Sequence, residues 1–168
     1  ELKSIIDLKK EMEAGTLTII PMNGNLLENW IASHFLENTN ALEFHLYDSD
    51  KGSDNENRYL ESIKKVNQRG DGSYGTLTKL REIENYVPKD IIEEYFGIEI
   101  NLEVDWAVAD IPKLISNLSN NNEKKIKKNI CRECSKKIRK DHLTKMGTWD
   151  EIEGWFLEIR GMMERCRR

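Results

Sequence analysis

The first half of the chain alternates between two hydrophobic spacings, one helical and one extended. Apolar residues three or four positions apart predict helices, and short apolar or β-branched runs predict strands. The predicted order is helix, strand, helix, strand, helix, strand over residues 2–13, 17–20, 26–36, 42–47, 59–66 and 75–80. This alternation is typical of an α/β fold with a mainly parallel sheet flanked by helices.

Beyond Pro88 the hydrophobic spacing is helical throughout. It predicts short helices at residues 90–95 and 110–118, a basic amphipathic helix at 124–140 and a last helix at about 149–163. We therefore expect residues 1–96 to form an α/β core and residues 97–168 to form a mostly helical C-terminal part of the same domain.

Composition narrows the classes of function. The chain has 168 residues, of which 33% are charged, and a net charge of −4. The acidic balance argues against a module that holds nucleic acid by bulk charge alone, but not against an enzyme that meets phosphates through a metal. We expect no membrane span, because no apolar run is long enough. Three cysteines are too few for a disulfide framework and indicate a reducing cytoplasm.

Acidic residues follow two of the predicted strands. Asp48 and Asp50 come directly after the apolar run that ends at Tyr47, and Glu82 and Glu84 follow the strand predicted at 75–80. The carboxyl ends of parallel strands meet at one edge of a sheet, so these carboxylates should lie close together. Unpaired carboxylates repel one another, and a hard divalent cation with oxygen ligands removes that repulsion. The other interpretation of Asp48 and Asp50 is that they only form a turn.

Other residues with possible chemistry have simpler interpretations. Cys131 and Cys134 form a single Cys-x-x-Cys pair, which supplies only half of a structural zinc site, and Cys134 falls on an apolar stripe. His45 lies within the central strand and is expected to be packed rather than to act as a general base. Arg81 is either an ion-pair partner of the glutamates or a phosphate contact. The basic helix at 124–140 is either a DNA-facing surface or a solvated one.

Two segments resemble the Toprim nuclease domain of the overcoming-lysogenization-defect (OLD) family of ATP-dependent endonucleases, which includes anti-phage defence nucleases. Residues 44–50, Phe-His-Leu-Tyr-Asp-Ser-Asp, look like the Asp-x-Asp strand end of that family. Residues 80–87, Leu-Arg-Glu-Ile-Glu-Asn-Tyr-Val, look like its Arg-Glu-Ile-Glu-Asn-Tyr segment. Asn23-Gly24-Asn25, before a tryptophan-bearing helix, is similar to the turn that precedes the Asp-x-Asp strand. The resemblance covers residues 15–96 well and the remainder loosely.

The resemblance implies a Toprim-like fold and a metal-dependent DNA endonuclease. Asp48 and Asp50 would hold Mg²⁺ or Mn²⁺, with Glu84 as a further acidic ligand and Glu82 ranked behind it. A lysine from the C-terminal part of the family lies near the scissile phosphate, and Lys145 is the candidate here. The implied partners are DNA and an ATPase domain in the same or a partner chain, in a homo-oligomer.

The sequence departs from the family in one respect. A Toprim domain begins with a strand that ends in a Glu-Gly turn, and neither this strand nor a Gly-rich phosphate-binding loop is found here. We expect the chain, which begins at Glu1, to be a piece of a longer protein, with the strand cut away, disordered or supplied elsewhere. One alternative function is a catalytically inactive Toprim-like regulatory or protein-interaction module. Another is a response-regulator-like receiver domain, in which the Glu-Asn-Tyr segment would have no role.

Overall fold

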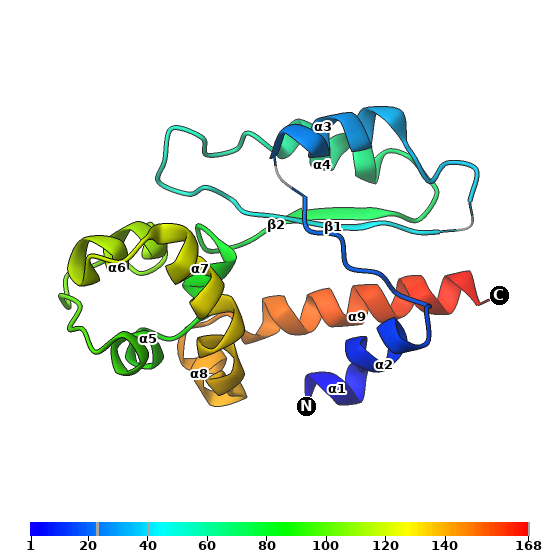
Figure 1. Cartoon of the computed structure of the whole chain (residues 1–168). Coiled ribbons are helices and arrows are strands. Elements are labelled where there is room, and N and C mark those ends of the chain that lie inside the picture. The colour runs from blue at the N-terminus through cyan, green and yellow to red at the C-terminus, as the bar shows by residue number, and fades with distance from the viewer. Residues whose placement is uncertain (23, 40, 168) are drawn as a thin grey trace. The chain divides into compact units, whose positions relative to one another are not determined.

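The computed structural model describes residues 1–22, 24–39 and 41–167, without the side chains of residues 24–28. Within these ranges the chain is rich in helix and contains a small two-stranded parallel sheet flanked by helices (Figure 1). This agrees with the predicted α/β class.

The chain divides into two compact units that interleave along the sequence. The first unit comprises Glu1–Tyr47, Tyr59–Thr76 and Glu151–Arg168, and the second comprises Asp48–Arg58 and Leu77–Asp150. The division predicted at residue 96 stays a prediction.

The first unit contains the sheet and most of the helices near the chain ends. Its elements are α1 (Leu2–Ile5), α2 (Leu8–Glu13), α3 (Gly24–Ser33), β1 (Phe44–Tyr47), α4 (Leu60–Asn67), all but the last residue of β2 (Tyr74–Leu77) and all but the first two residues of α9 (Trp149–Cys166). The helices predicted at 26–36, 59–66 and 149–163 and the strands predicted at 42–47 and 75–80 are thus confirmed, with small shifts of their ends.

Hydrogen bonds of Glu43, the residue before β1, join the starts of the two strands. The amide of Tyr74 donates to the carbonyl of Glu43 at 2.8 Å, and the amide of Glu43 donates to the Ser73 hydroxyl at 3.0 Å. The end of α4 is fixed to β2 by Asn67, whose carboxamide accepts from the Gly75 amide at 2.7 Å and donates to the Gly75 carbonyl at 3.1 Å. A Cβ at Gly75 would lie 3.4 Å from the Ile63 Cα, so the missing side chain lets α4 pack closely on the strand.

Two predictions for the first unit are corrected. Residues 17–20 do not form a strand: Ile19 and Ile20 are exposed to 58% and 51%, so neither burial nor a neighbouring strand in the described ranges stabilises extended pairing. The helix predicted at 2–13 is broken in two. Ile6 is extended, and the carboxylate of Asp7 accepts from the Lys10 amide and so begins α2 afresh.

The predicted turn at residues 23–25 begins at Asn23, which lies outside the described residues. Gly24 and Asn25 belong to the first turn of α3.

The second unit is built from short helices. They are η1 (Ile83–Tyr86), α5 (Lys89–Phe96), α6 (Ile111–Ser119), α7 (Glu123–Arg132), η2 (Cys134–Lys137) and α8 (Lys140–Lys145), where η1 and η2 are 3₁₀ helices. The helices predicted at 90–95 and 110–118 are confirmed as α5 and α6. Their apolar faces meet α7 in one core, which contains Val87, Ile91, Ile92, Ile100, Ile111, Ile115, Ile126, Ile130 and Cys134.

The basic helix predicted at 124–140 is not continuous. It ends as α7 at Arg132, and the Ser135 hydroxyl donates to the carbonyl of Cys131 where the next element begins. Ile138 packs against the apolar core, but its backbone is extended and not helical. The apolar spacing therefore predicted correctly which side chains reach the core. Its prediction of one continuous helix was wrong.

No helix in the described ranges is both long enough and apolar enough to cross a membrane.

Candidate functional site

The turn that carries Asp48 and Asp50 is joined to the segment that follows β2. The amide of Ser49 donates to the Thr78 hydroxyl at 2.9 Å, and the Ser49 hydroxyl donates to the Leu80 carbonyl at 2.7 Å. The amide of Asp50 donates to the carbonyl of Arg81 at 3.0 Å. These bonds bring the two acidic segments together at the ends of the two strands, as the sequence predicted.

The Glu-Asn-Tyr part of the second segment has a clear structural role. Asn85 is fully buried, and its carboxamide donates to the carbonyls of Trp106 and Ala109 at 2.6 and 2.9 Å. The Tyr86 hydroxyl accepts from the Lys79 amide at 2.9 Å. Because these two side chains fix η1, they determine where the neighbouring glutamate side chains lie.

Asp48 contacts η1 directly. Its Oδ1 accepts from the Ile83 amide at 3.0 Å, at the start of that helix. Burial raises the pKa of Asp48, and the nearby charges of Glu82 and Asp50 act in the same direction, against the charge of Lys127. An elevated pKa means that ionised Asp48 is short of positive charge or hydrogen-bond donors.

Glu84 is the most deeply buried carboxylate of the site. The residue is 1% exposed, and its Oε1 lies 3.2 Å from the Nζ of Lys127 and 3.7 Å from the Cys131 thiol, which donates to it. Its Oε2 is buried without a hydrogen-bond partner in the described part of the chain. Burial raises the pKa of Glu84, and the charge of Glu82 adds to the rise, although Lys127 opposes it.

Lys127 is the cation that the carboxylates share. Its Nζ lies 3.2 Å from the Oε2 of Glu82 as well as 3.2 Å from Glu84. Burial lowers its pKa, but the combined charges of Glu84, Glu82 and Asp48 outweigh burial and raise it. Lys127 therefore stays protonated and partly neutralises these three carboxylates.

Asp50 differs from the other three carboxylates. Its backbone is left-handed, with φ of 51°, and its Oδ2 lies 2.9 Å from the Nε of Arg58. We refer to Asp48, Asp50, Glu82 and Glu84 together as the acidic cluster. All four belong to the second unit. The carboxylate of Asp50 is already in an ion pair with Arg58.

The remaining predicted residues lie around the acidic cluster or apart from it. Arg81 donates to the Val108 carbonyl at 3.2 Å and lies 3.8 Å from Glu82 and 3.7 Å from Asp110, which favours the structural ion-pair interpretation. Lys145 is exposed in the last turn of α8, and in the described ranges Lys127, not Lys145, contacts the acidic cluster.

The other candidate residues are explained by packing and hydrogen bonds. Cys134 lies fully buried in the apolar core, whereas Cys131 donates to Glu84. His45 is packed, as expected: its Nε2 donates to Glu43 at 2.6 Å, and its Nδ1 accepts from the Tyr47 hydroxyl at 3.0 Å.

The acidic cluster fits a hard divalent cation in its donor chemistry. It offers only carboxylate oxygens, which Mg²⁺ and Mn²⁺ prefer, and Glu84 supplies an oxygen that no donor satisfies. As the side chains stand, no three His, Cys, Asp or Glu residues in the described part of the chain surround one point closely enough to hold a metal. The Lys127 ammonium stands against two of the carboxylates, so a cation would have to displace it.

Sequence reasoning missed Lys127. It lies 45 positions after Glu82 and is one of several lysines in a basic helix, so its spacing does not distinguish it. Only the packing of α7 against η1 selects it.

No protein-family model, curated protein or solved structure matches this chain.

Proposed function

We propose that this chain is the metal-dependent DNA endonuclease domain of an ATPase-coupled, oligomeric defence nuclease of the cytoplasm, with a Toprim-like fold. The resemblance of the Asp-x-Asp and Glu-Asn-Tyr segments supports the class of protein. The acidic cluster supports a reaction that uses Mg²⁺ or Mn²⁺.

The observation that carries this proposal is the environment of Glu84. Glu84 is 1% exposed, has one oxygen without a partner in the described part of the chain and has a raised pKa. Burying such a carboxylate lowers the stability of the fold, so a purely structural role does not explain it. A divalent cation shared with Asp48 would satisfy that oxygen and remove the repulsion between the two carboxylates. Perturbed carboxylates of this kind concentrate at functional sites.

Each residue of the site has a role in this proposal. Asp48 and Glu84 would hold the metal, with Asp50 and Glu82 as additional ligands. When bound, the metal supplies an activated water and stabilises the leaving oxygen in phosphodiester hydrolysis. Lys127, released from the glutamates, contacts a phosphate oxygen of DNA and offsets the charge that develops there. Lys145 remains a second candidate for that phosphate contact.

A catalytically inactive regulatory or interaction module is the second candidate function. The observation that favours it is the ion pairing already present: Lys127 neutralises Glu82 and Glu84, and Arg58 pairs with Asp50. In this alternative the acidic cluster is a closed network that needs no metal.

Plasmid cleavage by the intact protein separates the two functions. Asp48→Ala should abolish cleavage in Mg²⁺ or Mn²⁺, and EDTA should do the same to the wild type. A matched control is Asp54→Ala in the same turn, because Asp54 is exposed and outside the acidic cluster. Cleavage that is unchanged in Asp48→Ala contradicts the nuclease proposal and favours the inactive module.

A further inference from the structure

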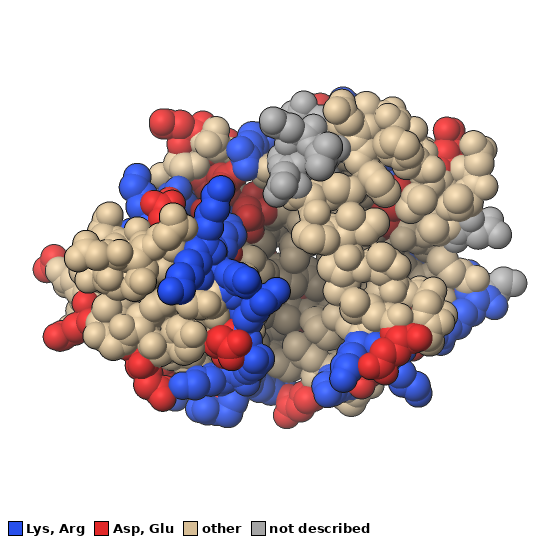
Figure 2. Space-filling view, in the orientation of Figure 1, with Lys and Arg blue, Asp and Glu red and all other residues tan. Residues whose placement is uncertain are grey.

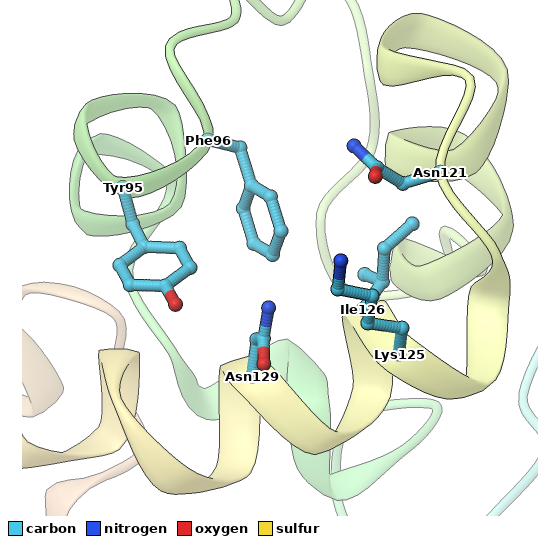
Figure 3. A pocket seen from close by; sticks show the side chains of 6 residues that line it. All are labelled: Tyr95, Phe96, Asn121, Lys125, Ile126 and Asn129. Carbon is cyan, nitrogen blue, oxygen red and sulfur yellow. The ribbon is translucent and has the colours of Figure 1, made fainter.

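A pocket of about 230 Å³ lies in the second unit, beside the end of α5 and one face of α7 (Figure 3). It is lined by Tyr95, Phe96, Asn121, Lys125, Ile126 and Asn129. Pockets for drug-sized ligands have volumes of about 300–1,000 Å³. This one is smaller, so it has room for a single ring system rather than for a whole dinucleotide.

Two aromatic rings form one side of the pocket. Tyr95 and Phe96 are packed edge to face, with ring centroids 4.9 Å apart and an interplanar angle of 78°. Tyr95 is 39% exposed although it is large and aromatic, and Figure 3 shows the Phe96 ring pointing into the pocket. Exposed rings at a concave surface provide stacking contacts for flat ligands.

Two carboxamides face these rings from the other side. The Asn129 side chain points from α7 toward Phe96 and has no hydrogen-bond partner within the described residues (Figure 3). Asn121 donates one N–H to the Ser119 carbonyl at 3.3 Å, which leaves its carbonyl oxygen for a ligand. A carboxamide offers a donor and an acceptor side by side, which matches the N6 and N7 edge of adenine.

Positive charge lies beside the pocket. Lys125 is part of the lining, and the neighbouring Lys124 and Lys128 are exposed on the same helix. Figure 2 shows blue lysine and arginine side chains gathered over the part of the surface where α7 and α8 lie. A flat polar ligand that carries a phosphate suits this combination.

We propose that the pocket binds one nucleobase, with adenine favoured. The base stacks on the Tyr95 ring and meets the nearly perpendicular Phe96 ring edge to face. Its edge pairs with the carboxamides of Asn129 and Asn121, and Lys125 lies against the attached phosphate. The base comes from single-stranded DNA or from a free nucleotide. The choice of DNA as the source of the base rests on the proposed nuclease function. The binding of a base does not depend on that function.

The pocket and the acidic cluster lie on different faces of α7. Lys125 and Asn129 line the pocket, Ile126 and Ile130 lie in the core, and Lys127 meets the glutamates. A helix with its side chains is about 10–12 Å wide. Substitutions in the pocket therefore leave the acidic cluster intact, and the two sites can be tested separately.

Fluorescence anisotropy with a labelled deoxyadenosine oligonucleotide, measured on the intact protein in EDTA, tests the proposal without any cleavage. Tyr95→Ala should weaken binding by about tenfold, the loss expected when one base–aromatic stack is removed. Asn129→Leu should reduce the preference for oligo-dA over oligo-dT. Asn117→Leu, at an exposed position outside the pocket, is the matched control and should change neither quantity.

Competition with AMP identifies the source of the base. If AMP displaces the oligonucleotide when the two are present at similar concentrations, the base site takes a free nucleotide. If AMP is far weaker, the site takes single-stranded DNA. Absence of binding by the wild type, or equal binding by wild type, Tyr95→Ala and Asn129→Leu, overturns the proposal. Asn129→Leu keeps the test valid if Tyr95→Ala fails to fold, and loss of cleavage in Asp48→Ala bears only on the acidic cluster.

Discussion

Two buried glutamates, one in each unit, have opposite environments. Glu43 of the first unit is 8% exposed, and Trp30 and His45 donate to its Oε2 at 3.0 and 2.6 Å. Its Oε1 accepts no hydrogen bond within the described residues but lies 2.9 Å from the Nη1 of Arg69 in an ion pair. Burial opposes its ionisation, but these hydrogen bonds and the charge of Arg69 lower its pKa to about 2.

Glu84 of the second unit has fewer partners and more negative neighbours. Burial raises its pKa, the charge of Glu82 raises it further, and Lys127 only partly opposes them. Its Oε2 is unpartnered within the described residues. The comparison teaches that burial of a carboxylate does not by itself indicate function. The charge of Glu43 is balanced by an arginine and two hydrogen-bond donors, whereas Glu84 shares one lysine with Glu82 and keeps an oxygen without a partner in the described part of the chain.

The largest expected effect is on DNA cleavage, which should depend on Glu84 and not on Glu43. Glu84→Gln in the intact protein should reduce metal-dependent DNA cleavage by about 10–100-fold, the range typical of substitutions at a metal site. Its free energy of unfolding should change by less than about 1 kcal/mol, because the ionised form is already disfavoured at this position. Plasmid cleavage and urea unfolding measure the two quantities. Equal cleavage by Glu84→Gln and wild type would contradict the assignment.

The second effect is on stability. Glu43→Gln should lower the free energy of unfolding by about 3 kcal/mol at pH 7, because it leaves the buried charge of Arg69 without its partner. The carboxylate of Glu43 has a folded pKa of about 2, below its ordinary value of 4.5, so its stabilisation is present above pH 4.5 and is lost as the pH falls toward 2. Urea unfolding between pH 3 and pH 7 should show the difference between variant and wild type shrinking in acid. A constant difference would mean that packing, not charge, is lost.

Glu84 should respond to pH in the opposite sense. Its folded pKa is raised, so its protonated form favours the fold, and that contribution is lost as the pH rises through the raised pKa. Glu84→Gln should therefore lower the free energy of unfolding, if at all, only at pH values below that pKa. Glu43→Gln should lower it mainly above pH 4.5.

A third effect comes from the metal itself. At ten times its dissociation constant, Mn²⁺ should stabilise the protein by about 1.4 kcal/mol, which raises the melting temperature by about 3–5 °C for a chain of this length. The rise should persist in Glu43→Gln and disappear in Glu84→Gln. Differential scanning calorimetry in Mn²⁺ and in EDTA measures it, and a rise retained by both variants would place the cation elsewhere.

The smallest effect concerns Lys127. If its ammonium competes with the metal for Glu82 and Glu84, Lys127→Gln should tighten Mn²⁺ binding about two- to fivefold, the scale of a partly exposed ion pair. Calorimetric titration with Mn²⁺ measures this change, and Lys128→Gln on the next position of α7 is the control. Weaker binding by Lys127→Gln would mean that this lysine supports the metal site rather than opposes it.

The sequence predicted the meeting of Asp48 and Asp50 with Glu82 and Glu84 because that meeting depends on local order, two strands each followed by acidic residues. It did not predict Lys127, because helix packing between distant segments selects that side chain. The strand expected at residues 17–20 failed for a related reason: a β-branched run becomes a strand only where a partner strand and burial are available. Glu43 gave no signal in the sequence, since its partners Trp30 and Arg69 lie in distant segments, the one in α3 and the other in the turn after α4.

The central claim is that the acidic cluster binds a divalent cation, and an anomalous difference map from a crystal soaked in Mn²⁺ tests it most directly. The account predicts a peak within about 2.5 Å of oxygens from Asp48 and Glu84, with the Lys127 ammonium moved away from the glutamates. A map without a peak there, with Lys127 still paired to Glu82 and Glu84, would contradict the claim and leave the acidic cluster as a closed ion-pair network.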